Sequence, residues 1–157
     1  MSRTLYSRRQ LLRYSIAMTV MPALAATVPA SAGGLPELTV YRNPGCGCCH
    51  KWAMGLQADG FLTTLIDDPE LDKRRSQAGV PPQLAGCHTA VLGDYIIEGH
   101  VPSEDIVRFL KEKPQARGLA VAGMPLGSPG METNGPKDAY DVMLFTSDGK
   151  WQVFARH

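Results

Sequence analysis

The most constraining feature of this sequence is a short strand followed at once by three clustered cysteines. The run ELTVY at residues 37–41 alternates apolar and polar side chains, which predicts a strand. A turn is predicted at residues 43–45, and Cys46, Cys48 and Cys49 come directly after it. The thiols therefore lie at the start of a predicted helix, where unpaired backbone N–H groups and the helix dipole stabilise a thiolate.

The rest of the sequence predicts a mixed α/β domain. Helices are predicted at residues 49–59, 68–78 and 103–113, and further strands at residues 61–66, 89–93, 95–99, 142–146 and 151–154. Gly60 is expected at the C-terminal cap of the first helix, and Asp68 and Ser103 are expected as N-caps of the other two. This order predicts a thioredoxin-like fold, with a central mixed sheet and flanking helices.

The spacing of the cysteines helps to distinguish a redox pair from a metal site. Cys46 and Cys49 have C-x-x-C spacing, but a third thiol at Cys48 competes with such a pair for mixed disulfides. Cys87 comes just before the predicted strand at residues 89–93, where a thioredoxin-like fold usually has a cis-proline facing the C-x-x-C loop. Four sulfurs then converge, and an all-thiolate set favours Cu(I). We expect Cys46, Cys48, Cys49 and Cys87 to bind copper.

Other interpretations of the cysteines stay open. Four cysteines in an exported domain often form two structural disulfides. Cys46 and Cys49 alone support a thiol–disulfide oxidoreductase, and four thiolates also suit an iron–sulfur cluster. His88 is a further candidate ligand or a plain loop histidine, whereas His50 is expected to be solvated and His100 to be structural.

The segment from Pro114 to Ala139 is unusual, because it has five glycines, four prolines and no clear strand or helix. Loops of this length in compact domains are commonly functional or disordered. Met124 and Met131 lie in it, and their thioethers suit Cu(I) or can pack over the core as adaptable apolar side chains.

The first 32 residues have the features of an export signal. Four arginines and no acidic residue accompany an apolar stretch at residues 16–28, and ASA at residues 30–32 has the small side chains of a cleavage site. SRRQLL at residues 7–12 is typical of a twin-arginine signal, and the alternative is an ordinary secretory signal whose two arginines fall together by chance. We therefore expect a signal at residues 1–32, a metal-binding domain at residues 33–157, and a periplasmic location reached by the twin-arginine route.

The charge of the predicted domain excludes some partners. Removing the four arginines from 16 basic residues leaves 12 against 15 acidic residues, a net charge of −3. A weakly acidic domain is not typical of nucleic-acid binding. No second apolar run is long enough to cross a membrane, so no membrane contact is expected after signal cleavage.

Four motifs together resemble the CopG-type copper-resistance proteins. They are YRNPGCGCCHKW, GCHTAVLGDYIIEGHVP, GLAVAGMPLGSPGME and YDVMLF, and the resemblance runs from about Leu38 to Phe154. The resemblance implies a thioredoxin-like fold, export, and copper held by the four cysteines. It also implies a role in copper tolerance, with electron transfer between Cu(I) and Cu(II) and with other periplasmic copper-handling proteins as partners.

Overall fold

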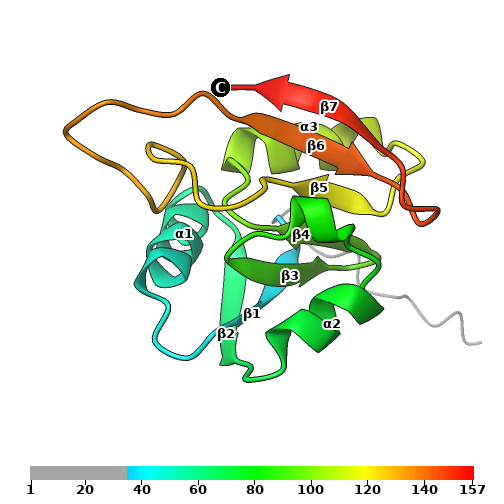
Figure 1. Ribbon diagram of the computed structural model, residues 1–157, viewed down its shortest axis with the longest axis horizontal. Coiled ribbons are helices and arrows are strands. Elements are labelled where there is room, and N and C mark those ends of the chain that lie inside the picture. Colours follow the sequence, from blue (N-terminus) through cyan, green and yellow to red (C-terminus); the bar gives the residue numbers. More distant parts are fainter. Residues whose placement is uncertain (1–34) are drawn as a thin grey trace, which may run out of the picture. The chain divides into compact units, whose positions relative to one another are not determined.

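The computed structural model describes residues 35–157, which form a mixed sheet with flanking helices (Figure 1). The strands are β1 Glu37–Arg42, β2 Leu62–Asp67, β3 His88–Leu92, β4 Tyr95–Glu98, β5 Gly118–Ala120, β6 Asp141–Phe145 and β7 Trp151–Arg156. The helices are α1 Gly47–Ala58, α2 Leu71–Gln77 and α3 Ser103–Glu112, with a 3-10 turn at Pro82–Leu84. None of these helices is long and apolar enough to cross a membrane. The predicted signal at residues 1–32 lies outside the described residues.

The sheet has seven strands in the order β2-β1-β3-β4-β5-β6-β7. β1 and β2 are parallel and are connected through α1, whereas β3 runs antiparallel to β1 and to β4. The prediction of an α/β fold with a central mixed sheet is confirmed. Residues 35–157 contain no cis peptide bond, in agreement with the absence of a proline before β3.

The prediction that residues 114–139 hold no strand is wrong, because β5 lies within them. β5 pairs parallel with β4 and antiparallel with β6. It is only three residues long and fully buried, so its sequence lacks the alternation that marks a half-exposed strand. Gly118 opens it because the two backbones approach closely, and a Cβ there would lie 1.8 Å from the Ile96 carbonyl oxygen.

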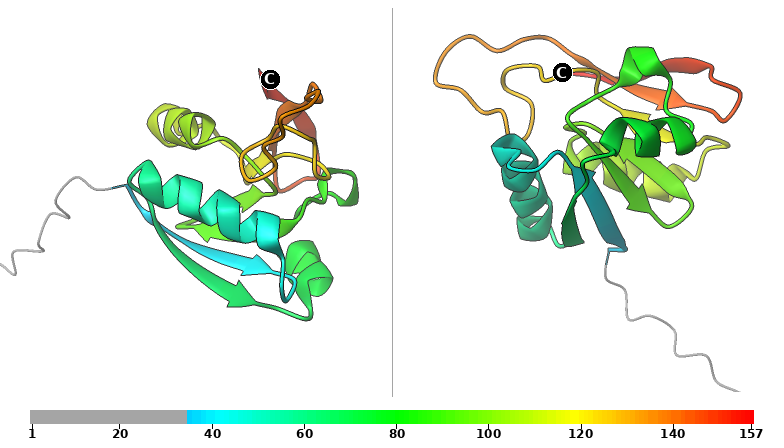
Figure 2. Two further views of the ribbon diagram at one scale, coloured as in Figure 1. Left: turned by 90° about the vertical axis from the view of Figure 1, so that its left-hand side faces the viewer. Right: turned by 60° about the horizontal axis from the view of Figure 1, so that its bottom comes forward.

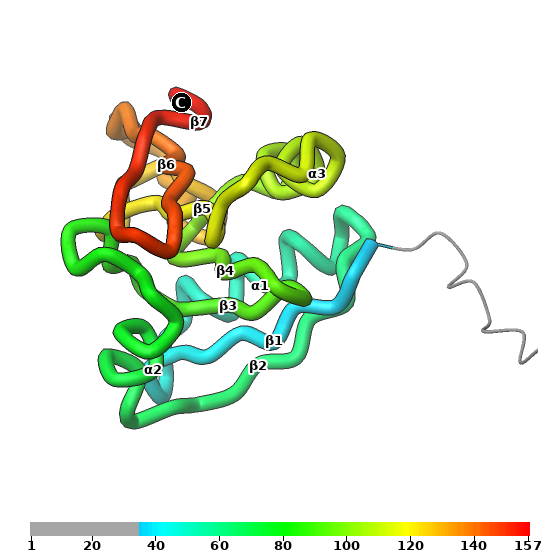
Figure 3. The backbone as a smooth tube through the Cα atoms, turned by 90° about the vertical axis from the view of Figure 1, so that its right-hand side faces the viewer, coloured from blue at the N-terminus to red at the C-terminus, as the bar shows by residue number. Residues whose placement is uncertain are grey.

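Each face of the sheet carries its own apolar cluster. Leu38 and Val40 of β1 pack with Trp52 of α1 and Phe109 of α3 on one face. The cluster on the other face joins the segment after α2 to the strands, and its buried members are Val80, Leu84, Ile96, Ala120 and Phe145. α2 accordingly lies across the sheet from α1 and α3 (Figures 2 and 3).

The helix ends agree with the sequence in one case and differ in two. Gly60 follows α1 with a φ of +96°, and the Phe61 N–H bonds the Leu56 carbonyl at 3.0 Å, as a glycine C-cap requires. Ser103 is the first residue of α3 and not its N-cap, because its hydroxyl donates to Asp59. Asp68 precedes α2 by three residues and accepts the Glu70 N–H at 2.9 Å in a local turn.

Candidate metal centre

All four cysteines of the chain meet at one end of β1 and β3. Cys46 immediately precedes α1, and Cys48 and Cys49 belong to its first turn. Cys87 comes directly before β3, whose first residue His88 is paired with Arg42 at the end of β1. The cysteine loop leaves β1 at that same end, so sheet register brings residues about 40 positions apart into contact.

The Cys87 sulfur is in contact with the sulfurs of the other three cysteines. The Cys87 Sγ lies 3.2 Å from the Sγ of Cys46, 3.2 Å from that of Cys48 and 3.3 Å from that of Cys49. The Sγ atoms of Cys46 and Cys48 are 3.4 Å apart. Cys49 is buried, while the other three side chains are half-buried. This is a soft, all-sulfur donor set with one side accessible, and such a set suits Cu(I).

Cys46 and Cys49 are joined by a disulfide, whereas Cys48 and Cys87 are free thiols. Burial raises the pKa of the Cys87 thiol to about 12, and the adjacent Cys48 thiol adds to the rise. The structure therefore describes an oxidised form in which Cys46 and Cys49 are joined and the Cys87 thiol is protonated. Reduction by two electrons is needed before four thiolates are available, and a metal ion must then displace protons from the thiols that bind it.

An arginine holds the cysteine loop against β1. The Arg42 Nη1 donates to the Cys46 carbonyl at 2.8 Å, and its Nε lies 2.9 Å from the Asp67 carboxylate on β2. The guanidinium thus links the loop to both parallel strands. The Cys46 side chain makes no capping hydrogen bond to α1. Its sulfur instead points toward the other cysteines.

A buried carboxylate holds the chain on both sides of Cys87. Glu98 of β4 has no exposed surface and accepts the Gly86 N–H at 2.7 Å and the Thr89 hydroxyl at 2.6 Å. Arg75 of α2 pairs with it at 2.6 Å and also donates to the Gly86 carbonyl at 3.0 Å. Burial raises the pKa of Glu98, and these hydrogen bonds oppose part of the rise. We infer that Glu98 is ionised at neutral pH, because all its partners are donors.

Two histidines lie buried next to the sulfurs. His88 and His100 are both fully buried, and one ring nitrogen of each lies within 4.8 Å of the other and of the Cys49 Sγ. Burial lowers the pKa of His88 well below its usual value, with His100 and Arg75 adding to the effect, and burial lowers the pKa of His100 to about 4. Both imidazoles are thus neutral at pH 7, the form that binds metals.

The two candidate methionines differ in position. Residues 121–140, here called the cover loop, approach the start of α1, where a Cβ on Gly130 would lie 2.6 Å from the Cys48 carbonyl oxygen (Figure 2). Met131 follows Gly130 and is half-buried at this contact. Met124 is 56% exposed and borders a surface hollow with Leu84 and Met143, so it is not placed among the sulfurs.

Sequence reasoning did not assign a functional role to Arg75, Glu98 or His100. A recognisable signal was the glutamate in YIIEG, a charged residue ending an otherwise apolar strand. The expectation that His50 is solvated agrees with its exposed side chain on α1. His100 is buried beside the cluster, with its Nδ1 3.5 Å from the Ser128 hydroxyl oxygen of the cover loop.

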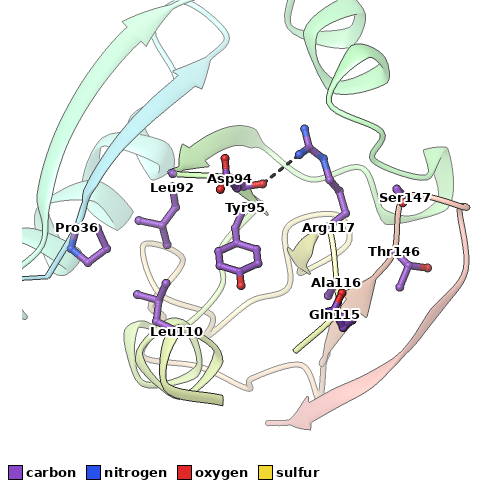
Figure 4. A pocket seen from close by; sticks show the side chains of 11 residues that line it. Pro36, Leu92, Asp94, Tyr95, Leu110, Gln115, Ala116, Arg117, Thr146 and Ser147 are labelled. Atoms are coloured by element: carbon purple, nitrogen blue, oxygen red, sulfur yellow. Dashed lines mark hydrogen bonds between the residues drawn. The ribbon is translucent and has the colours of Figure 1, made fainter. Parts of the chain in front are cut away.

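A hollow of about 620 Å³ lies at the opposite end of β1 and β3 from the cysteines (Figure 4). Tyr95 and Leu110 line it, and Arg117 beside them donates to the Asp94 carbonyl at 3.0 Å. It contains no cysteine or histidine, so the metal-binding chemistry of the described residues is concentrated at the cysteine end.

Comparison with known proteins places this geometry in a family. The family model described as "Protein of unknown function, DUF411" matches residues 84–131, which include Cys87, both buried histidines and the cover-loop methionines. Two solved structures, titled "Copper resistance protein copG", Form 1 and Form 2, are each 40% identical to the chain. The chain covers 98% of each, they cover 80% and 78% of it, and the TM-scores are 0.75 and 0.74.

The chain belongs to the CopG family. No curated protein matches its sequence. The resemblance found in the four motifs is confirmed by the structural matches, and the cysteine cluster of this CopG-family protein is a group of side chains able to hold a metal ion.

Proposed function

We propose that this CopG-family protein binds copper in the periplasm through Cys46, Cys48, Cys49 and Cys87 and so contributes to copper tolerance. The observation that carries the proposal is the contact of the Cys87 sulfur with the sulfurs of all three clustered cysteines. Two solved structures of similar sequence carry a copper-resistance title, which supports copper as the metal. Thiolates bind Cu(I) more strongly than they bind harder ions.

The disulfide supports a redox role for the same site. When Cys46 and Cys49 are reduced, their two thiols hold two electrons that two Cu(II) ions can accept. The products are two Cu(I) ions, two protons and the Cys46–Cys49 disulfide, so atoms and electrons balance. Cys48 and Cys87 stay as thiols beside the disulfide, where they can retain Cu(I). The protein would then lower Cu(II) and hold part of the product.

The test is a competition titration of the reduced protein under anaerobic conditions. Cu(I) is added with a chromogenic Cu(I) chelator and an excess of Zn(II), and bound copper is measured after desalting. We expect copper to stay bound against zinc, because the site offers sulfur ligands only. A sample with alkylated cysteines is the control. Complete displacement of copper by zinc would exclude the proposal.

A thiol–disulfide oxidoreductase is the second candidate, and the Cys46–Cys49 disulfide favours it. Against it, the Cys87 thiol occupies the position next to both disulfide sulfurs, where a substrate thiol would approach. Insulin reduction by the dithiol form separates the two functions. Rapid catalytic reduction together with weak copper binding would favour the oxidoreductase.

The periplasmic location rests on residues 1–32 and is tested separately. Arg8→Lys with Arg9→Lys should prevent export if the twin-arginine route is used, because the paired arginines are its recognition element. Fractionation of cells that express the wild type and the double variant measures this. Equal amounts in the periplasm would point to the general secretory route.

A further inference from the structure

Two methionine thioethers share a surface hollow that none of the four cysteines lines. Met124 belongs to the cover loop and Met143 to the middle of β6, and both border a hollow of about 570 Å³. Met143 is half-buried, and Met124 is 56% exposed. The two residues are far apart in the sequence, so their meeting at one hollow is a product of the tertiary structure.

The exposure of Met124 is not explained by packing. A methionine that serves the core fills irregular gaps with its flexible side chain. In this hollow Leu84 has the packing role, because it is only 4% exposed. Met54 on α1 is as exposed as Met124, at 55%, but it does not border the hollow. Exposure together with a second thioether therefore distinguishes Met124 from an ordinary surface methionine.

The carboxylates of the hollow already have partners. Asp138 accepts the Leu126 N–H at 2.8 Å, and Asp141 lies 3.7 Å from the Arg156 Nε. These contacts hold the two ends of the cover loop and the start of β6 at the rim of the hollow. Thioether sulfur is a weak hydrogen-bond acceptor but a soft ligand that suits Cu(I). The hollow thus offers two soft sulfur donors on a braced rim.

The cover loop also connects this hollow with the cysteine site. Gly123 forms a parallel bridge with Gly86, and its N–H donates to the Ala85 carbonyl at 2.9 Å. The two chains run in the same direction there, so Met124 follows Gly123 as Cys87 follows Gly86. A single backbone bridge therefore leads from the methionine hollow to the thiol that contacts the other three sulfurs.

We propose that Met124 and Met143 form a separate, weaker Cu(I) site that receives copper at the surface and passes it to Cys87. This inference rests on the proposed function, because the cysteines are the acceptor of the copper. Two neutral thioethers hold Cu(I) less tightly than thiolates, which add the attraction of opposite charges. Transfer to the cysteines is therefore favourable. It changes no oxidation state, and the proton displaced from the Cys87 thiol passes to solvent.

The first experiment removes the free thiols and asks whether the hollow binds Cu(I) by itself. The full-length Cys48→Ser/Cys87→Ser protein is kept in its Cys46–Cys49 disulfide form, in which no thiol remains. Cu(I) is added anaerobically as its acetonitrile complex, and the NMR signals of isotope-labelled methionine methyl groups are recorded.

The expected result is a joint shift of the two methyl signals. Met124 and Met143 should shift with one midpoint, while the signal of Met54 should stay in place. Adding Met124→Leu should abolish the shift of Met143, because one thioether alone no longer makes the site. Adding Met54→Leu, the control of equal exposure, should leave that shift unchanged.

The second experiment measures transfer. The reduced wild type, Met124→Leu and Met54→Leu are mixed with Cu(I) in a stopped-flow instrument, and the ultraviolet absorption of copper–thiolate bonds is followed. We expect Met124→Leu to load more slowly than the other two proteins but to reach the same copper per chain. Equal loading rates of all three proteins would overturn the transfer to Cys87.

The outcomes separate this inference from the proposed function. Absent or independent shifts of Met124 and Met143, or an equal shift of Met54, would overturn the thioether site and leave copper binding by the cysteines standing. Methyl shifts in a protein whose reduced wild type holds no copper on its cysteines would support the thioether site and overturn the proposed function. If the serine variant does not fold, as a melting curve would show, the same joint methyl shift is measured in the reduced wild type.

Discussion

Replacing Glu98 by glutamine should destabilise the protein and loosen the segment that carries Cys87. Glutamine keeps the shape of the side chain but removes its charge. Glu98 is fully buried, and its partner Arg75 is 11% exposed, so the guanidinium loses its buried counter-ion. The variant also weakens the contacts that hold the Gly86 N–H and the Thr89 hydroxyl on either side of the Cys87–His88 pair.

The expected size of the effect follows from this burial. Breaking a buried ion pair by removing one partner costs about 3–5 kcal/mol, because the remaining charge is desolvated and unpaired. A glutamine oxygen still accepts one hydrogen bond, so we expect the lower end, about 3 kcal/mol of the free energy of unfolding. Copper affinity should fall as well, because Cys87 is no longer held in place before binding.

The assay is urea denaturation of the reduced, metal-free protein, followed by Cu(I) titration of the folded variant. Asp72→Asn is the matched control, because Asp72 pairs with the same Arg75 at 2.5 Å but is 97% exposed. Exposed pairs contribute about 0–1 kcal/mol, so the control should stay close to the wild type. If Glu98→Gln lost no more stability than Asp72→Asn, the argument that Glu98 positions the Cys87 segment would be refuted.

Three further substitutions test the site. Cys87→Ser should remove most of the copper-dependent rise in melting temperature, because bound metal then no longer links β3 to the cysteine loop. Thermal melts with and without Cu(I) measure this rise. A full rise in the variant would contradict Cys87 as a ligand. Cys48→Ser should lower the copper bound per chain but leave disulfide reduction by Cys46 and Cys49 intact, and unchanged copper content would make Cys48 a bystander. Gly130→Ala should cost about 1–3 kcal/mol in urea denaturation, because φ is +84° and the new Cβ would lie 2.6 Å from the Cys48 carbonyl oxygen. Gly135→Ala, whose Cβ would meet only the Thr133 hydroxyl at 3.6 Å, is its control, and equal stability of the two variants would show that the cover loop does not pack on α1.

Local elements were largely predictable from the sequence, because their causes lie within a few residues. The alternation in residues 37–41 and the apolar stripe of the first helix predicted β1 and α1. Gly60 ends that helix as expected, and the strands predicted at residues 142–146 and 151–154 pair as β6 and β7. In each case steric limits on the backbone or the side-chain period act within one element.

One helix start and one strand were predicted wrongly for a tertiary reason. Ser103 was expected to cap α3 with its hydroxyl, but that hydroxyl donates to Asp59 at the end of α1. The three-residue β5 was missed because a short buried strand has neither alternation nor length to mark it. Both outcomes depend on neighbours that are distant in the sequence.

In the candidate site, too, some features follow from local sequence and others only from tertiary contacts. The C-x-C-C run at the start of a helix is a local pattern, and its thiolate-stabilising position follows from the sequence alone. Only the antiparallel pairing of β1 with β3 brings the Cys87 sulfur within 3.2–3.3 Å of the other three sulfurs. Only packing of α1 and the cover loop on the sheet buries His100 and leaves its Nε2 without a hydrogen bond. A sequence specifies which donor atoms are available, whereas their convergence and desolvation arise from contacts between elements, which no local pattern encodes.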